Sequence, residues 1–253
     1  MTWSAKQYSA FEDERTRPVR DLVNAIPRDH VAVAVDLGCG PGNSTKVLAE
    51  RYPSAAINGL DSSVDMIEAA RARLPRMQFD VADIADWQAS RPMDVILANA
   101  SLQWLPDHHT LYPRLVGLLS ERGCLAVQTP DNLLEPPHRL ARDIAAKGRW
   151  ASKIEGVRHP ERHAALWYYA LLKPLCAHVD VWRTTYFHPL RDHQAIVEWF
   201  KGSALRPYLA PLSPEERQEF LADYQQAITL ECPAFADGTV LLPFPRLFLV
   251  ATR

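Results

Sequence analysis

The amino-acid sequence predicts an α/β fold, a mostly parallel β-sheet with helices on both faces. From about residue 31 to residue 128, apolar runs alternate with amphipathic stretches, a pattern typical of a parallel sheet covered by helices. The first apolar run then breaks into alternating glycines at Gly38, Gly40 and Gly42, directly before a helical stretch. Such a strand–turn–helix unit lets a backbone turn approach a ligand closely at a helix N-terminus.

Five apolar runs predict the strands of the first half, over residues 30–37, 55–60, 77–81, 94–98 and 123–128. The stretches between them predict helices over residues 44–51, 64–74 and 111–119. The second helix carries a capping signal, because Ser62 and Ser63 follow Asp61 at the end of the second apolar run.

The second half of the chain is predominantly helical. Residues 133–175 and 190–232 form two helical blocks, residues 178–188 alternate like a strand, and residues 239–252 predict a strand broken at Pro243 and Pro245. We therefore expect an N-terminal helical segment, a ligand-binding core, a helical cap inserted over the carboxyl ends of the strands, and two final strands of the sheet. The N-terminal segment comprises residues 1–30 and the ligand-binding core residues 31–132. The cap comprises residues 133–175 and 190–232, and the final strands lie within residues 176–189 and 239–253.

Composition excludes several classes of protein. A formal net charge of −2 over 253 residues gives no reason to expect nucleic acid, which demands a clustered basic surface. The four cysteines form no C-x-x-C pair and the adjacent His108 and His109 lack spaced partners, so we expect neither a metal site nor a disulfide framework. No secretory signal and no apolar run long enough to span a bilayer is found. We expect a soluble cytoplasmic protein without a membrane partner, and we infer no obligate protein partner.

The spacing of the glycines bears on which nucleoside cofactor binds. Gly38 and Gly40 fit the dinucleotide fingerprint, but Asn43 occupies its third glycine position. Asp36 precedes the loop, and its negative charge would repel a pyrophosphate and could attract the ammonium group of an amino acid, directly or through water. Asp61 is placed to accept hydrogen bonds from a ribose diol. The pattern favours S-adenosylmethionine over NAD; a tight glycine turn without a ligand is the alternative.

The residues 36–42, Asp61, Ala82-Asp83-Ile84 and 99–107 together resemble class I S-adenosylmethionine-dependent methyltransferases. The resemblance implies a Rossmann-like, seven-stranded sheet with a helical cap, and S-adenosylhomocysteine as a product. It implies that the glycine loop lies under the methionine part of the cofactor, that Asp61 binds the ribose hydroxyls and that Asp83 contacts the adenine amino group. The remaining residues expected around the cofactor are Asn43, Ser62, Met66, Ile84, Asn99, Ser101 and Trp104.

A closer resemblance covers nearly the whole chain and is weakest over residues 138–165. Residues 99–107, 127–132, 181–186 and 244–248 resemble the branch of this family that esterifies one carboxylate of a small unsaturated tricarboxylic acid. The resemblance also implies that the N-terminal helix folds over the cofactor with Tyr8 near the reaction centre, where a hydrophobic anchor is the alternative. The rival functions are methyl transfer to another small acid or to a carrier-bound acyl group, and binding of the cofactor by a scaffold without catalysis.

Methyl transfer to a carboxylate needs no general base, because the attacking oxygen is already anionic at neutral pH. The protein must instead position donor and acceptor and exclude water. Guanidinium groups suit a polycarboxylate, so Arg183 and Arg246 are the first candidates and Arg206 the third, with surface salt bridges as the alternative. Trp104 is expected to shield the reacting centre unless it merely fills space. The other residues predicted at the acceptor are Gln128 and Tyr186.

Overall fold

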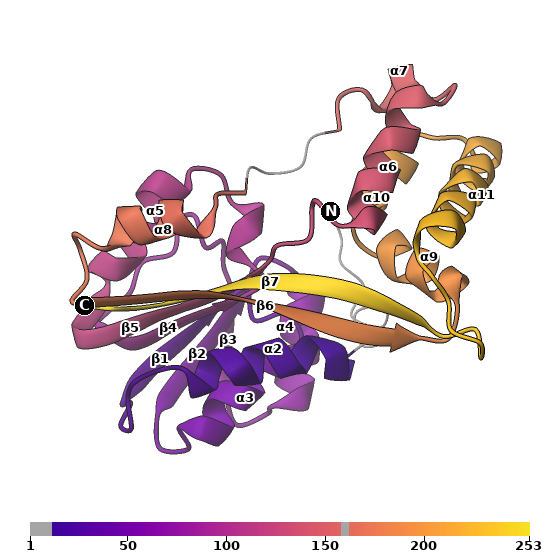
Figure 1. Ribbon diagram of the computed structural model, residues 1–253. Coiled ribbons are helices and arrows are strands. Elements are labelled where there is room, and N and C mark those ends of the chain that lie inside the picture. Colours follow the sequence, from indigo (N-terminus) through magenta and orange to yellow (C-terminus); the bar gives the residue numbers. More distant parts are fainter. Residues whose placement is uncertain (1–11, 158–161) are drawn as a thin grey trace. The chain divides into compact units, whose positions relative to one another are not determined.

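The computed structural model describes residues 12–157 and 162–253, and its strands form a seven-stranded sheet in the order β3-β2-β1-β4-β5-β7-β6 (Figure 1). Strand β1 pairs in parallel with β2 and β4, β2 with β3, and β4 with β5, whereas β7 is antiparallel to β5. The predicted mostly parallel, seven-stranded sheet is confirmed. The strands are β1 (Val33–Leu37), β2 (Ala56–Asp61), β3 (Gln78–Val81), β4 (Met93–Asn99), β5 (Leu119–Pro130), β6 (His178–Leu190) and β7 (Val240–Thr252).

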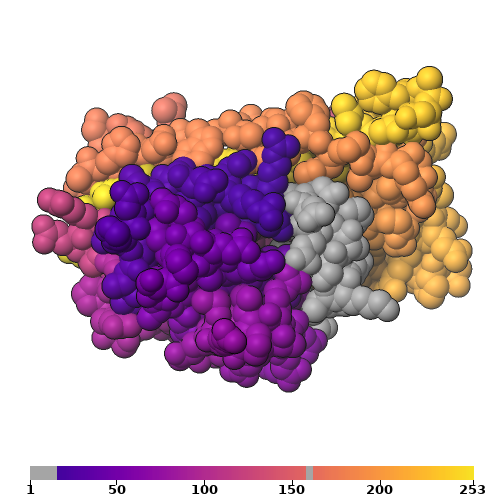
Figure 2. Space-filling view, turned by 90° about the horizontal axis from the view of Figure 1, so that it is seen from below, coloured from indigo at the N-terminus to yellow at the C-terminus, as the bar shows by residue number. Residues whose placement is uncertain are grey.

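Helices cover both faces of the sheet, as predicted. Helices α2 and α3 lie on one face and α5 and α8 on the other (Figure 1). Figure 2 shows the first of these faces, where the indigo and purple N-terminal part of the chain covers the strands. The helices of the sheet region are α2 (Glu12–Asn24), α3 (Asn43–Arg51), α4 (Val64–Arg73), the short 3-10 helix η2 (Leu102–Trp104), α5 (His108–Gly117) and α8 (Ala165–Leu172).

The central strands are almost continuously apolar, because a parallel sheet covered on both faces exposes neither side to water. Val35, Ile96 and Leu125 are each at most 1 % exposed. They belong to one cluster with Leu115 of α5 and Leu172 of α8. Burial of this cluster fixes the sheet against the α5 and α8 layer and so positions the carboxyl ends of β1 and β4.

The chain divides into two compact units. Unit 1 comprises residues 1–130, 160–184 and 246–253, and unit 2 comprises residues 131–159 and 185–245. Unit 2 contains the C-terminal end of β6 and the N-terminal end of β7. Its helices are α6 (Pro136–Lys147), α7 (Ala151–Ile154), α9 (His193–Lys201), α10 (Arg206–Leu209) and α11 (Pro214–Glu231). Among the described residues, none of the helices combines the length and the apolar character needed to cross a membrane.

Two features differ from the sequence expectations. Helix α8 falls inside the range expected for the cap but groups with unit 1, because Tyr168 and Leu172 are buried in the core of the sheet region. Strand β7 runs unbroken through Pro243 and Pro245, so the predicted break is wrong. The prolines are tolerated because pairing with β5 begins only at Arg246, and their missing N–H groups cost no hydrogen bond to that strand.

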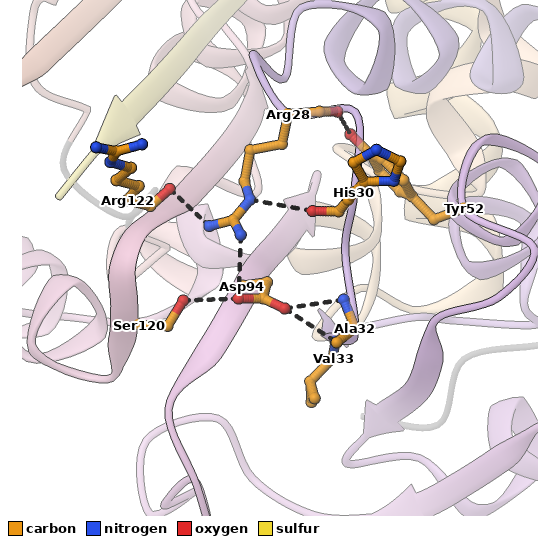
Figure 3. Close-up of polar contacts among 8 residues, drawn as sticks. All are labelled: Arg28, His30, Ala32, Val33, Tyr52, Asp94, Ser120 and Arg122. Atoms are coloured by element: carbon orange, nitrogen blue, oxygen red, sulfur yellow. Dashed lines mark hydrogen bonds and ion pairs between the residues drawn. The ribbon is translucent and has the colours of Figure 1, made fainter.

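A carboxylate ties the amino ends of β1 and β4 together (Figure 3). Asp94 accepts hydrogen bonds from the backbone N–H groups of Ala32 (2.9 Å) and Val33 (3.2 Å) and from Ser120 Oγ (2.7 Å). Arg28 Nη2 lies 3.3 Å from its Oδ1. Burial raises the pKa of Asp94, but these hydrogen bonds and the Arg28 charge outweigh it, so the pKa is lowered overall. The ionised Asp94 carboxylate therefore stabilises the pairing of β1 and β4 at the edge of the sheet opposite the glycine loop.

Candidate functional site

A cavity of about 340 Å³ opens at the carboxyl ends of β1, β2 and β4 in unit 1. Because β1 lies between β2 and β4, this is the point at which the strand order reverses, the usual ligand-binding position in open α/β sheets. Its volume falls within the roughly 300–1,000 Å³ typical of small-molecule pockets. The lining residues are Gly38, Gly40, Asp61, Ser62, Met66, Ala82, Asp83, Ile84, Ala85, Asn99, Ala100, Ser101, Trp104, Leu105 and Pro106.

The glycine loop is tightly folded against the ends of the neighbouring strands. The N–H groups of Gly38 (2.7 Å) and Cys39 (2.9 Å) both donate to the carbonyl of Leu60. Gly38 has a φ of +72°, and a Cβ built there would lie 2.4 Å from the Cβ of Ser101. Ser101 itself donates from Oγ to the Leu37 carbonyl at 2.6 Å. The close approach of two backbone segments therefore requires glycine at position 38.

Two carboxylates shape the cavity from the side of β2 and β3. Asp61 Oδ2 accepts a hydrogen bond from the Gly40 N–H (3.0 Å), and Oδ1 accepts one from the Ser63 N–H (2.9 Å). Each carboxylate oxygen has a second lone pair, so Asp61 can hold both loops and still accept hydrogen bonds from a ligand. Asp83 Oδ1 accepts from the Ala85 N–H at 2.8 Å, and its exposed side chain lines the cavity. This wall is thus rich in acceptors for hydroxyl and amino groups.

Asp36 lies fully buried behind the glycine loop rather than on the cavity wall. Its Oδ2 accepts from Ser44 Oγ (2.7 Å) and Thr45 Oγ1 (2.6 Å), while its Oδ1 has no hydrogen-bond partner among the described residues. Burial raises the pKa of Asp36 to about 6, against the lowering effect of the two hydroxyl donors and with a smaller contribution from the Asp61 charge. Asn43 also does not line the cavity. Both residues stay predictions as cofactor contacts.

The turn after β4 forms the wall opposite the two carboxylates. The N–H of Ala100 donates to the Gln128 carbonyl at 2.8 Å, which fixes the start of the turn to β5. Asn99 Oδ1 is buried and has no hydrogen-bond partner among the described residues. Trp104 lines the cavity with 53 % of its surface exposed. This wall therefore offers one buried acceptor and one large aromatic ring to a bound molecule.

The predicted acceptor residues are divided between the two units. Arg246 is 4 % exposed and donates from Nη1 to Gln128 Oε1 at 3.1 Å. Arg183 is exposed on β6, and none of the three lines the cavity. The buried Tyr186 and the partly exposed Arg206 lie in unit 2. The remaining candidate near the reaction centre, Tyr8, lies outside the described residues.

Sequence reasoning missed five residues of the cavity wall, which are Ala82, Ala85, Ala100, Leu105 and Pro106. All five lie within two positions of a predicted residue in the chain, and their small or apolar side chains carry no chemical signal of their own. Within residues 12–157 and 162–253, no cluster of three or more His, Cys, Asp or Glu side chains could hold a metal ion.

Known proteins share this fold and much of the sequence. A family model described as a methyltransferase domain matches residues 34–123. The trans-aconitate 2-methyltransferase of Rhizobium etli is 50 % identical, with 100 % of both chains covered. The trans-aconitate 2-methyltransferase of Methylobacterium radiotolerans is 52 % identical, with 99 % of this chain and 98 % of that chain covered.

Solved structures are similar in fold at low sequence identity. The YcgJ protein of Bacillus subtilis matches with a TM-score of 0.61 at 10 % identity, covering 94 % of this chain and 98 % of that one. A phosphoethanolamine N-methyltransferase of Haemonchus contortus, solved with S-adenosylhomocysteine, matches with a TM-score of 0.55 at 12 % identity, covering 94 % and 52 % of the two chains.

The fold is that of the class I methyltransferases, and the cavity lies where open α/β sheets bind ligands. Relatives that are 50 % and 52 % identical over almost the full length of the chain narrow this class to one family. The chain belongs to the trans-aconitate 2-methyltransferase family.

Proposed function

We propose that the protein transfers the methyl group of S-adenosylmethionine to one carboxylate of trans-aconitate, giving a monomethyl ester and S-adenosylhomocysteine. The observation that carries the proposal is the cavity at the strand-order reversal, walled by Asp61, Asp83 and Asn99, in a chain of this family. The protein is accordingly a carboxyl O-methyltransferase with S-adenosylmethionine as its cofactor.

The residues of the cavity fit this cofactor group by group. The Asp61 carboxylate has lone pairs left to accept hydrogen bonds from the ribose diol. Asp83, beside the apolar Ile84, suits the adenine and its amino group. Asn99 Oδ1 is a buried acceptor suited to the ammonium of the methionine part. The absence of a Cβ at Gly38 lets the loop pack closely against Ser101 on the opposite wall. Ser62, Met66 and Ser101 complete the proposed contacts.

The chain's own contribution to the reaction is positioning and exclusion of water. The bound cofactor supplies an electrophilic methyl group on a sulfonium, and a carboxylate oxygen accepts it without any proton transfer. Trp104, half exposed on the cavity wall, is placed to cover the reacting centre. Holding two reactants in attack geometry and excluding water contributes on the order of 7–11 kcal/mol in well-oriented systems.

Arg246 is the best-supported contact for the acceptor. Its guanidinium is buried and hydrogen-bonded to a neutral amide, Gln128, whose backbone carbonyl also anchors Ala100 of the cavity wall. A buried positive charge beside this wall favours binding of a polyanion. Arg183, Arg206, Tyr186 and Tyr8 are proposed as further contacts on the sequence resemblance alone.

The partner that we propose is a small polycarboxylic acid, with no nucleic acid, membrane or obligate protein partner. Residence in the cytoplasm is supported by the four cysteines, Cys39, Cys124, Cys176 and Cys232, which form no disulfide.

Incubation of the purified protein with methyl-labelled S-adenosylmethionine and a panel of di- and tricarboxylic acids tests the proposal. Base-labile labelled product with trans-aconitate, in preference to the other acids, is expected. Turnover with a different acid and none with trans-aconitate would refute the acceptor while keeping the enzyme class. Cofactor binding without turnover on any acid would favour the scaffold alternative.

A further inference from the structure

The wall of the cavity that carries Trp104 is a strained turn. Of the described residues other than glycine, Ala100, Asp107 and Arg122 have a positive φ, and two of these three flank the turn of residues 101–106. Left-handed backbone is unfavourable for residues with a Cβ, so it persists only where surrounding contacts hold it. Ala100 has a φ of 54° and Asp107 a φ of 55°. Contacts from outside the turn must therefore determine where Trp104 lies.

The start of the turn is well held. The Ala100 N–H donates to the Gln128 carbonyl, Ser101 Oγ donates to the Leu37 carbonyl at 2.6 Å, and Gln103 Nε2 donates to the Ala100 carbonyl at 2.7 Å. These bonds fix the turn to β1 and β5. The third bond joins Gln103 of η2 to the start of the turn, so none of the three ties η2 to an element outside the turn.

A buried histidine binds the middle of the turn. His108 is 3 % exposed at the first turn of α5, and its Nε2 lies 2.9 Å from the carbonyl oxygen of Leu102, two residues before Trp104. Its Nδ1 lies 2.7 Å from the hydroxyl of Tyr168 on α8. The Tyr112 ring packs against both, with centroids 5.2 Å from His108 and 5.0 Å from Tyr168. The middle of the turn is thus connected through His108 to α8.

The partners of the ring fix its tautomer. A carbonyl oxygen only accepts, so Nε2 must carry the proton and donate to Leu102. In the neutral ring Nδ1 then accepts from the Tyr168 hydroxyl. Burial lowers the pKa of His108 and favours this neutral form, and it outweighs the hydrogen bond to the Leu102 carbonyl, which acts in the opposite direction. By donating to Nδ1, the Tyr168 hydroxyl therefore favours the tautomer whose proton is on Nε2 and is donated to Leu102.

From this arrangement we infer that His108 and Tyr168 are positioning residues for cofactor binding, because together they hold the Leu102–Trp104 turn against the cavity. The inference rests on the proposed function only in taking this cavity as the S-adenosylmethionine site. The two side chains do not line the cavity, so their effect on a ligand passes through the turn.

Paired substitutions separate this role from a general loss of stability. His108→Gln places an amide nitrogen near Nε2 and keeps the donor to Leu102, whereas His108→Asn reaches only the region of Nδ1 and loses that donor. We expect His108→Asn to weaken S-adenosylhomocysteine binding in calorimetry by about 3- to 10-fold, the range for loss of one hydrogen bond, and His108→Gln to restore most of it. Tyr168→Phe is expected to weaken binding by about 3-fold because Nδ1 loses its donor and only the bond to Leu102 then orients the ring.

Tyr52→Phe is the matched control, because Tyr52 is also buried and donates from its hydroxyl to one backbone carbonyl, that of Arg28, at 2.9 Å, away from the cavity. It should lower Tm as the His108 and Tyr168 variants do and leave the cofactor Kd unchanged. Equal Kd values for the wild type, His108→Asn and Tyr168→Phe would overturn the inference while the proposed function stands. If His108→Asn does not fold, Tyr168→Phe alone decides in the same way. Failure of the wild type to bind S-adenosylhomocysteine would overturn the proposed function and this inference together.

Discussion

Substitution of Gly38 by alanine tests how closely the glycine loop approaches the turn after β4. Two separate costs are expected. The first is the left-handed backbone, with a φ of +72°, which costs an L-residue about 1–2 kcal/mol. The second is a collision, because the new Cβ would lie 2.4 Å from the Cβ of Ser101, nearer than side-chain carbons pack.

The collision can be relieved only if Ser101 moves, which breaks its 2.6 Å hydrogen bond to the Leu37 carbonyl. Overpacking of this kind costs about 1–3 kcal/mol. Alanine also restricts the unfolded chain, which offsets about 0.4–1 kcal/mol. We therefore expect Gly38→Ala to lower the free energy of unfolding by about 2–4 kcal/mol and to weaken cofactor binding, because Ser101 lines the cavity.

Gly40 provides a matched control inside the same loop. Its φ is +53°, but a Cβ there would meet nothing within 4 Å. Gly40→Ala should therefore show only the backbone cost, a net loss of about 1 kcal/mol.

Urea denaturation of both single variants, of Ser101→Gly and of the double variant Gly38→Ala/Ser101→Gly measures the collision directly. Removal of the Ser101 Cβ should make the double variant more stable than additivity predicts, with a coupling of about 1–3 kcal/mol. Equal losses for Gly38→Ala and Gly40→Ala, together with additive behaviour of the double variant, would refute the close approach of loop and turn.

Four further predictions concern charge. Arg246→Met should lower kcat/KM for trans-aconitate about 10- to 100-fold, the range for loss of a charged hydrogen bond, with cofactor affinity unchanged; calorimetry showing an equal loss of cofactor affinity would count against its acceptor role. Asp94→Asn should cost about 1.5–3 kcal/mol of stability near neutral pH. Because the folded pKa of Asp94 is depressed, that difference between variant and wild type should shrink as urea denaturation is repeated at pH values falling below about 4, and a constant difference would contradict this. The pKa of Asp36 rises from 3.8 to about 6 on folding, so the folded state binds the extra proton and wild-type stability should fall by about 3 kcal/mol as pH rises between these values. Ionised Asp36 attracts a cationic cofactor, so calorimetric affinity for S-adenosylmethionine should weaken as pH falls through about 6, whereas a flat profile would argue against its electrostatic role.

Local patterns in the sequence were sufficient to predict the sheet and the loop that begins the cavity. The apolar runs that became β1, β2 and β4 are short and flanked by turn residues, and Gly38 and Asp61 stand where those strands end. Because the carboxyl ends of parallel strands meet at one edge, residues far apart in the chain, such as Asp61 and Asn99, line the same cavity.

Other features depend on tertiary contacts that a single sequence does not encode locally. Pro243 and Pro245 signal a broken strand, yet β7 is continuous because its pairing with β5 starts after them. Asp36 stays a predicted cofactor contact, but the sequence does not show that Ser44 and Thr45 enclose its side chain.

Contacts that reach the cavity through other residues cannot be read from the sequence, even where the residues themselves are predicted. Gln128 and Arg246 are 118 positions apart, and only the antiparallel pairing of β5 with β7 brings them together. The sequence shows His108 only as one of two adjacent histidines without metal-ligand spacing, whereas the structure buries it against Leu102 and Tyr168.

A crystal structure of the protein with S-adenosylhomocysteine tests the central claim most directly, because it locates the cofactor relative to Asp61, Asp83 and Asn99. We predict that the ribose hydroxyls lie within hydrogen-bonding distance of the Asp61 carboxylate, with the adenine beside Asp83 and the methionine part above the glycine loop. A cofactor bound elsewhere, or in this cavity with its ribose away from Asp61, would contradict the account.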